Sequence, residues 1–380
     1  MAPVARGSMA VAAAAASSSA VLLVAWYVSR RRRRRSGAGA AGAVPRRTWR
    51  EAGAEAIGAS CSTEPLVLTG VPLGECTQRW SDEYLGSAAG DLKVSVHVSD
   101  VPGLDFTAKN FRYEMMALDD MLARARGVGG DRRYYYYRSL HSKRNRPASL
   151  ECVGALAGDF ALPLALLHGA EVHSTVLRVA SVGLRMWLHY DVCDNFLCCV
   201  RGRKRVVLLH PREVGGLYVN GSSSLLGSRA LDPDADRLEE LWREFPLARA
   251  AWSRRLEVEL EAGDVLYIPA LWPHCTEALP ARTPQGALRG ASCAREIALS
   301  TNVFVVRPEL AALHDPKDVW ANRELLPAQE ALRALEERVV AKLQGVPGLH
   351  RAFYCRKAAS ALLALADAAD RAAAQPDRTA

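Results

Sequence analysis

Short apolar segments separated by turn residues recur through the middle of the chain. In residues 256–260, for example, charged and apolar residues alternate, which is typical of a strand with one buried face. About ten such segments follow one another without a strand–helix–strand repeat, which favours a mainly β fold, an antiparallel double-sheet jelly roll or double-stranded β-helix. The clearest strand predictions cover residues 65–69, 92–98, 176–179, 186–190, 197–200, 206–209, 256–260, 265–268 and 297–306.

Apolar residues at helical spacing predict helices that flank these strands. Residues 48–59 and 232–245 fit short helices, and residues 113–127 place a series of apolar residues at helical spacing. That series consists of Met115, Met116, Leu118, Met121 and Leu122. We expect these side chains to face the core.

Beyond Pro308 the pattern becomes helical. Helices are predicted over residues 327–343 and 349–374, on either side of the Gly-Val-Pro-Gly break at 345–348. Two helices alone cannot bury the apolar stripe of the first, so we expect them to dock on the barrel or on a second copy of the chain. The predicted organisation is an N-terminal segment at 1–46, a central, mainly β domain at 47–308 and a helical region at 309–380.

Residues 9–28 form a small and apolar run that is long enough to cross a bilayer as a helix. Trp26 and Tyr27 would lie at the membrane interface, and the arginines at 30–35 would stay on the cytoplasmic side. This pattern predicts an N-terminal membrane anchor with a catalytic domain in the cytosol. An organelle transit peptide is the alternative, because the segment contains alanine, serine and arginine but no acidic residue.

The basic charge is concentrated at the N-terminus. The chain has 49 basic and 41 acidic residues, and ten of the arginines lie in the first fifty positions, which leaves 39 basic residues against 41 acidic ones. This balance excludes a generally basic nucleic-acid binder, so any RNA contact must come from a local patch. The nine cysteines include no Cys-x-x-Cys pair, which indicates reduced thiols rather than a disulfide framework or a zinc site.

His189 and Asp191 are two positions apart and would share one face of a strand. His274, which follows the predicted strand at 265–268, can supply a third ligand. Two histidines and one carboxylate leave open positions on a metal ion and suit a non-heme Fe(II) oxygenase. A His-x-Asp pair alone is more often coincidental, so the prediction depends on the surrounding residues.

Lys204 lies in a basic, glycine-containing turn between two apolar runs, 197–200 and 206–209, which predicts a hairpin. A lysine on the returning strand could bind the carboxylate of an acidic co-substrate, or it could belong to a solvated turn. The tyrosine run at 134–137 sends alternate rings to opposite faces and could simply pack a barrel wall. The loop at 141–146 is basic and could be solvated or contact phosphates.

These motifs resemble the JmjC branch of the Fe(II)- and 2-oxoglutarate-dependent oxygenases over roughly residues 65–308. The resemblance implies a cupin-like jelly roll, O₂ as a co-substrate, and Fe(II) bound by His189, Asp191 and His274. It also implies that 2-oxoglutarate places its far carboxylate on Lys204, aided by Tyr136 and Asn195. Asn302 is expected to hydrogen-bond near the metal.

The closer resemblance is to the wybutosine-synthesizing members of this family, in segments 65–70, 109–111, 135–140 and 188–195. It implies hydroxylation of 7-(3-amino-3-carboxypropyl)wyosine beside the anticodon of tRNA-Phe, and a homodimer formed by the C-terminal helices. A phosphate-binding rim would then consist of Lys143, Arg144, Arg146, Arg201, Arg203 and Arg205. The alternatives are a protein side-chain hydroxylase, a histone demethylase, and an inactive membrane-tethered binding module.

Overall fold

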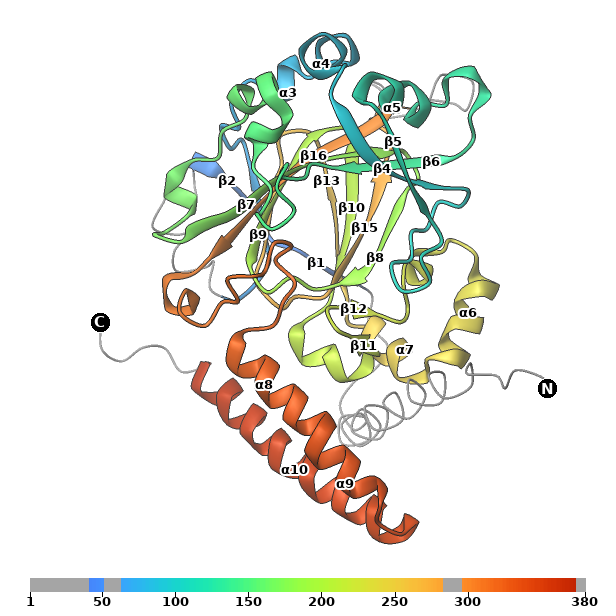
Figure 1. The fold of residues 1–380 in the computed structure, drawn as a ribbon, viewed down its shortest axis with the longest axis vertical. Helices are drawn as coiled ribbons and strands as arrows, with labels where there is room; N and C mark the ends of the chain where they lie inside the picture. Colours follow the sequence, from blue (N-terminus) through green and yellow to red (C-terminus); the bar gives the residue numbers. More distant parts are fainter. Residues whose placement is uncertain (1–40, 51–62, 283–295, 374–380) are drawn as a thin grey trace, which may run out of the picture. The chain divides into compact units, whose positions relative to one another are not determined.

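The computed structural model describes residues 41–50, 63–282 and 296–373 (Figure 1). The chain divides into two compact units, Ala38–Leu325 and a second unit whose described residues are 326–373. The predicted anchor at 9–28, most of the helix predicted at 48–59 and most of the basic, Gly-rich segment at 280–295 lie outside the described residues. Among the helices that the structure describes, none is both long and apolar enough to cross a membrane.

The first unit is built on two β-sheets, as the strand pattern predicts (Figure 1). The seven-stranded sheet has, in spatial order, β1 (Gly42–Ala43), β13 (Leu256–Leu260), β10 (Arg203–Leu208), β15 (His274–Leu279), β8 (Arg185–His189), β12 (Ser223–Ser224) and β11 (Val219–Asn220). The nine-stranded sheet has β2 (Arg46–Thr48), β3 (Leu66–Thr69), β14 (Val265–Ile268), β9 (Asp194–Arg201), β16 (Ile297–Val306), β7 (Glu171–Ser181), β6 (Tyr134–Arg138), β4 (Lys93–Ser99) and β5 (Arg112–Ala117). Neighbours are antiparallel except for β1 with β13 and β2 with β3.

Apolar side chains from both sheets pack together inside the barrel. Leu197 and Cys199 of β9 meet Val206 and Leu208 of β10 in one buried cluster, although the two strands belong to different sheets. The alternate residues of β9, including Phe196, point the other way and pack in the outer core with α4 and α5. Because β9 is buried on both faces, its sequence is a continuous apolar run rather than an alternating one.

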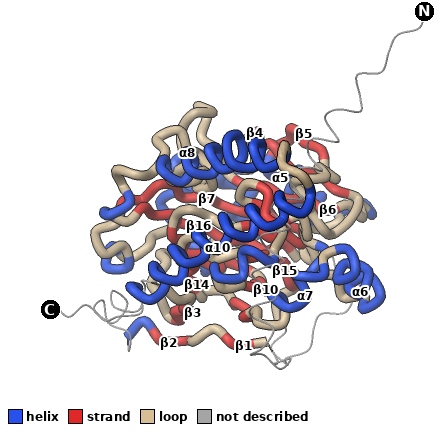
Figure 2. The backbone as a smooth tube through the Cα atoms, turned by 90° about the horizontal axis from the view of Figure 1, so that it is seen from below, coloured by secondary structure: helices blue, strands red, loops and turns tan. Residues whose placement is uncertain are grey.

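Helices of the first unit lie at the periphery of its sheets (Figure 2). The α-helices are α3 (Cys76–Arg79), α4 (Asp82–Ala89), α5 (Leu118–Ala125), α6 (Ala235–Glu244) and α7 (Pro246–Trp252). Helix α4 begins where the Ser81 side chain accepts a hydrogen bond from the Tyr84 backbone N–H, and α6 begins where Asp234 caps two backbone N–H groups. 3₁₀ helices cover Val128–Gly130, Leu150–Asp159, Leu164–Leu166, Pro211–Gly216, Arg229–Leu231 and Pro308–Leu310.

The helix predicted over residues 113–127 is wrong in its first half. Strand β5 pairs with β4 up to Ala117, and α5 begins only at Leu118. Tyr113 and Met115 are exposed on the same face of β5, as period-two alternation requires. Met115, Met116 and Leu118 also fit helical spacing together with the helix that follows. Periodicity alone therefore could not separate the strand from the helix.

The predicted hairpin of residues 197–209 is also wrong. The two runs form strands as expected, but β9 pairs with β14 and β16, whereas β10 pairs with β13 and β15. Gly202 takes the chain from one sheet to the other with a φ of +75°, and a Cβ there would come within 3.3 Å of the Ala298 Cα. A residue with a side chain would be strained at this crossing.

The second unit is helical, as predicted for its described residues. It consists of α8 (Leu326–Ala334), a π-helical turn (Leu335–Val340), α9 (Ala341–Gln344) and, after the glycine-proline break, α10 (Gly348–Ala373). Large apolar side chains such as Leu332 and Phe353 are exposed on these helices. The predicted homodimer through this unit stays a prediction.

Candidate metal centre and co-substrate pocket

Two neighbouring strands of the seven-stranded sheet bring the two predicted histidines together. His189 is the last residue of β8, His274 is the first residue of β15, and the two are direct partners in the strand register. Their ring centroids are 4.5 Å apart. Antiparallel pairing therefore places side by side two residues that are far apart in the sequence.

Asp191 completes the group from the turn that follows β8. Its Oδ2 lies 3.7 Å from the His274 Nε2, and one ligand atom from each of the three residues lies within 4.8 Å of the others. Asp191 is 8% exposed and His274 is 3% exposed. The three residues thus form a buried donor set of two nitrogens and one oxygen, which is able to bind a metal ion.

Backbone carbonyls fix both imidazole rings. The His189 Nδ1 lies 2.8 Å from the Trp187 carbonyl oxygen, and the His274 Nδ1 lies 2.9 Å from the Trp272 carbonyl oxygen. A carbonyl only accepts hydrogen bonds, so each Nδ1 carries the proton and each Nε2 keeps its lone pair for a metal. Burial, followed by the charge of His274, holds the pKa of His189 well below its usual value, which favours the neutral ligand form.

A chain of amides orients the carboxylate. The Asn302 Nδ2 donates to the Asn195 Oδ1 at 3.0 Å, and the Asn195 Nδ2 then donates to the Asp191 Oδ2 at 3.3 Å. Burial raises the pKa of Asp191, whereas neighbouring positive charges and the Asn195 hydrogen bond lower it. Asn302 therefore lies near the metal-binding group, as expected, but acts on it through Asn195.

Lys204 lies on β10, beside β15, and is not in a solvated turn. It is 8% exposed, and its Nζ donates to the Ser300 Oγ at 2.7 Å. Among the residues that the structure describes, none forms an ion pair with it. Burial lowers its pKa to about 8. A buried ammonium group with only a neutral partner is costly, and it is an available site for an anionic ligand.

Two arginines on adjacent strands enlarge this positive charge. Arg138 of β6 and Arg178 of β7 are partners in the register, and the Arg178 Nη1 donates to the buried Tyr136 hydroxyl. The Nε atoms of both arginines are buried without a hydrogen-bond partner in the described structure. The Arg138 guanidinium lies 4.3 Å from the centre of the Trp320 ring, and burial lowers its pKa to about 10.

Sequence reasoning missed Arg178. Its side chain shares one face of the sheet with Arg138 and Tyr136, and its charge acts on the pKa values of His189, Asp191 and Lys204. The only signal in the sequence is an arginine within an otherwise apolar strand, and its inward direction follows only from the β6–β7 register. Together with Lys204 and Arg138 it makes the pocket strongly positive around one carboxylate, a charge that suits a dicarboxylate ligand bound beside a metal ion.

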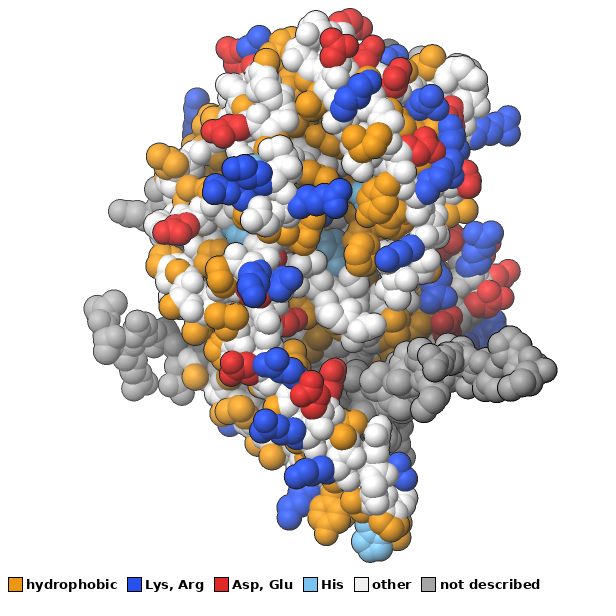
Figure 3. All heavy atoms as spheres, in the orientation of Figure 1, with side chains coloured by type: hydrophobic (Ala, Val, Ile, Leu, Met, Phe, Trp, Pro, Cys, Tyr) orange, Lys and Arg blue, Asp and Glu red, His pale blue; other side chains and the backbone are white. Residues whose placement is uncertain are grey.

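Aromatic side chains lie next to the histidines. The Trp187 ring is 5.8 Å from the His189 ring and stacks on Phe106 at 5.3 Å with an interplanar angle of 27°. Phe106 is 46% exposed, so this stack extends from the buried group to the surface. Figure 3 shows a hollow in this face of the molecule, with histidine side chains in its floor and hydrophobic and basic side chains around it.

Half of the predicted phosphate-binding rim is wrong. Lys204 faces the pocket, so its neighbours Arg203 and Arg205 point to the other side of β10, where they pair with Glu259 and Glu257. The Arg201 Nη1 donates a hydrogen bond to the Asp82 Oδ1 at 2.6 Å. The other half of the rim, the loop with Lys143, Arg144 and Arg146, is exposed, and no ion pair involves it within the described part of the chain.

Comparisons with known proteins agree with this geometry. A family model described as a cupin-like domain matches residues 58–304. The tRNA wybutosine-synthesizing protein 5 of Gallus gallus is 36% identical over 302 residues, which cover 77% of this chain and 86% of that protein. The protein 5 of Danio rerio is 37% identical over 77% of this chain and 83% of its own length. The tRNA wybutosine-synthesizing protein 4 of Neurospora crassa is 34% identical over 78% of this chain and 23% of its own length.

Proposed function

This chain belongs to the cupin-like domain family and to the family of tRNA wybutosine-synthesizing protein 5, and on that basis we propose that it is an Fe(II)- and 2-oxoglutarate-dependent oxygenase. Its substrate would be 7-(3-amino-3-carboxypropyl)wyosine beside the anticodon of tRNA-Phe, hydroxylated on the side chain. The observation that carries the proposal is the buried group of two histidines and one aspartate, with the buried Lys204 on β10, the strand that pairs with the β15 strand of His274.

The donor set fits Fe(II). His189 and His274 would bind the ion through their free Nε2 atoms, and Asp191 through a carboxylate oxygen held by Asn195. A facial group of two imidazoles and one carboxylate leaves the remaining positions open to small ligands. The backbone and amide contacts keep the three ligands in one orientation, so little reorganisation accompanies metal binding.

The pocket also fits 2-oxoglutarate. Lys204 and Ser300 would hold the far carboxylate, and Tyr136 and Asn195 would line the same cavity. When bound, the iron and this co-substrate supply the oxidation, in which O₂ converts 2-oxoglutarate to succinate and CO₂ and adds one oxygen atom to a substrate C–H bond. The chain itself binds and orients these partners and keeps bulk water away from them.

Three features support a modified tRNA base as the substrate. After Lys204 is assigned to the co-substrate, Arg138 and Arg178 still provide a buried positive charge for the carboxylate of an aminocarboxypropyl side chain. The Phe106–Trp187 stack offers an aromatic surface for a base. The exposed basic loop at 143–146 would bind backbone phosphates nearby.

The remaining parts of the proposal concern assembly and location. Exposed apolar side chains on α8 and α10, such as Leu332 and Phe353, support a homodimer through the C-terminal unit. The N-terminal run at 9–28 supports a membrane anchor with catalysis in the cytosol. Light scattering of the full chain tests the dimer, and membrane fractionation with and without residues 9–28 tests the anchor.

The decisive experiment is an anaerobic titration with Fe(II) and 2-oxoglutarate, followed by succinate measurement with O₂. We expect succinate release to rise with tRNA-Phe that carries the precursor base and to stay low with tRNA-Phe that lacks it. The K143A/R144A/R146A variant should raise the KM for tRNA and leave the uncoupled succinate release unchanged, because the loop lies outside the metal-binding group.

Three results would contradict the proposal. Stimulation by peptides rather than tRNA would identify a protein hydroxylase, and stimulation by methylated histone peptides would identify a demethylase. Failure to bind iron at all would identify an inactive binding module.

A further inference from the structure

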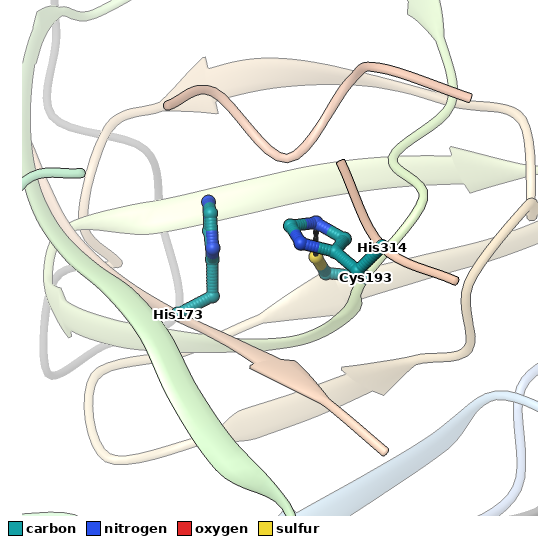
Figure 4. A group of neighbouring side chains, drawn as sticks. All are labelled: His173, Cys193 and His314. Atoms are coloured by element: carbon teal, nitrogen blue, oxygen red, sulfur yellow. Dashed lines mark hydrogen bonds between the residues drawn. The ribbon is translucent and has the colours of Figure 1, made fainter. Parts of the chain in front are cut away.

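A second buried group of ligand side chains lies outside the site described above. It consists of His173 on β7, Cys193 immediately before β9, and His314 in the segment that follows β16 (Figure 4). One ligand atom from each lies within 4.8 Å of the others. The sequence pattern gave no sign of this group, because its members come from three separate elements and include no paired cysteines.

The spacing of the atoms suits coordination of one ion. The Cys193 Sγ and the His314 Nε2 are 3.6 Å apart. For a tetrahedral zinc ion with Zn–S of about 2.3 Å and Zn–N of about 2.0 Å, two such ligand atoms are about 3.5 Å apart. The separation is close to the value for two ligands on a shared metal, and in the absence of an ion it also allows a hydrogen bond to sulfur.

His173 gives an independent indication. Its Nε2 is buried and has no hydrogen-bond partner in the described structure. Its ring lies 5.0 Å from the His314 ring, at an interplanar angle of 72°, on the side where Cys193 also lies (Figure 4). Buried polar atoms of this kind are nearly always satisfied by a protein group, a water molecule or an ion. The unsatisfied nitrogen therefore points to a missing ligand within this group.

Asp318 balances the charge. Its side chain is fully buried, accepts backbone N–H groups of Trp320, Asn322 and Arg323, and lies 3.4 Å from the His314 Nε2. A divalent cation, a Cys193 thiolate and this carboxylate add up to zero net charge. A buried site without net charge avoids most of the cost of desolvating an ion.

We propose that His173, Cys193 and His314 bind a divalent thiophilic metal ion, Zn²⁺ above all, with Asp318 as the adjacent balancing carboxylate. Imidazole and thiolate ligands favour Zn²⁺ over Fe²⁺, both by softness and by the general order of divalent affinities. This separates the new site from the oxygen-containing group at His189.

The bound ion would have a structural role. It would join three elements: β7, the chain just before β9, and the segment after β16. Cys193 is two residues from Asp191, and the Val192 N–H between them donates to the Ala321 carbonyl at 2.8 Å. The ion would therefore reinforce the contact between the Asp191 turn and the 314–321 segment.

Cobalt(II) substitution tests the proposal on the full chain. The H189A/D191A variant, stripped with a chelator, removes binding at the first group and leaves the second. We expect this protein to bind one equivalent of Co(II), with a thiolate-to-cobalt absorption band in the near ultraviolet and strong tetrahedral bands in the visible, and Zn(II) should displace the cobalt.

Three further variants in this background locate the ion. C193S should lose the thiolate band, and H173Q should weaken Co(II) binding at least tenfold while the band persists at saturation. C152S, which changes a cysteine away from the group, should behave like the parent. Absence of a thiolate band in the parent, an unchanged band in C193S, or unchanged affinity in H173Q would overturn the proposal. H173Q keeps the test valid if C193S does not fold, and none of these readouts depends on oxygenase activity.

Discussion

The two groups of ligand side chains differ in what surrounds them. At His189, Asp191 and His274, both rings are fixed by backbone carbonyls, the carboxylate is fixed by an amide, and the positive charges of Arg138 and Arg178 act on the group. At His173, Cys193 and His314, one carboxylate lies alongside and a ring nitrogen has no partner. Both groups have three ligands within the same distance.

The difference shows that the surroundings, rather than the ligand count, determine the use of a site. Excess positive charge beside the first group attracts an anionic organic ligand and makes an open coordination sphere useful. In the described part of the chain, the carboxylates that act on the second group are negative, with Asp318 nearest. Such surroundings suit a cation and do not attract an acidic co-substrate. We therefore expect changes at the first group to affect catalysis and changes at the second to affect metal content and stability.

The largest effect should come from Asp191→Ala. It removes the only anionic ligand of the first group, and loss of several kcal/mol of metal interaction corresponds to a decrease in activity of about 1,000-fold or more. Succinate release with tRNA measures this. Zinc content at the second group should be unchanged, and a parallel loss of zinc would show that the two groups are not independent.

Lys204→Met should have the second largest effect. Replacing one partner of a buried charge pair costs about 2–5 kcal/mol, so the KM for 2-oxoglutarate should rise about 100-fold or more, whereas iron affinity should change little. Kinetics at saturating tRNA measure the first quantity, and anaerobic iron titration measures the second. An unchanged KM would mean that the co-substrate carboxylate binds elsewhere, with Arg138 and Arg178 as the next candidates.

Asn195→Ala should have a smaller effect on iron binding. It removes the hydrogen bond to Asp191, and loss of such an outer contact typically lowers metal affinity about 10- to 100-fold. Asn302→Ala is the matched control, because it leaves the Asn195–Asp191 hydrogen bond in place. Equal losses in both variants would show that the effect comes from packing rather than from orientation of the carboxylate.

The smallest effect is the pH dependence of 2-oxoglutarate affinity. The pKa of Lys204 is lowered to about 8 by burial, so the ammonium charge is present below that pH and is lost above it. The dissociation constant of 2-oxoglutarate should therefore rise as the pH increases, by about fivefold between pH 8 and pH 9 if only the charged form binds. Calorimetry under anaerobic conditions checks this, with Lys204→Arg as the variant that should lose the dependence.

The sequence was sufficient for the double-sheet fold and for the convergence of His189, Asp191 and His274. Strand periodicity defines which residues share a face, but β8 ends at His189, so Asp191 joins the group from the turn beyond the strand and not from the same strand face as predicted. Periodicity does not say which strands become neighbours. For that reason the 197–209 hairpin was wrong, and Arg203 and Arg205 were placed on the wrong side of β10.

Two features could be found only from the way the strands and loops pair in the folded chain. Arg178 became visible only through its pairing with Arg138 on the adjacent strand. The group at His173 depends on a segment beyond the last barrel strand, where the sequence shows no regular pattern. Both are assembled by contacts between elements that are distant in the sequence. Local composition does not predict such contacts.

The strand order of the seven-stranded sheet has a consequence for how the protein matures. Strand β15 lies between β10 and β8, although both of these strands are synthesised well before it. An emerging polypeptide therefore contains His189, Asp191 and Lys204 before it contains the strand that lies between β10 and β8 in the finished sheet. His274 arrives with that strand, so the chain becomes able to capture iron only when this wall of the barrel is complete.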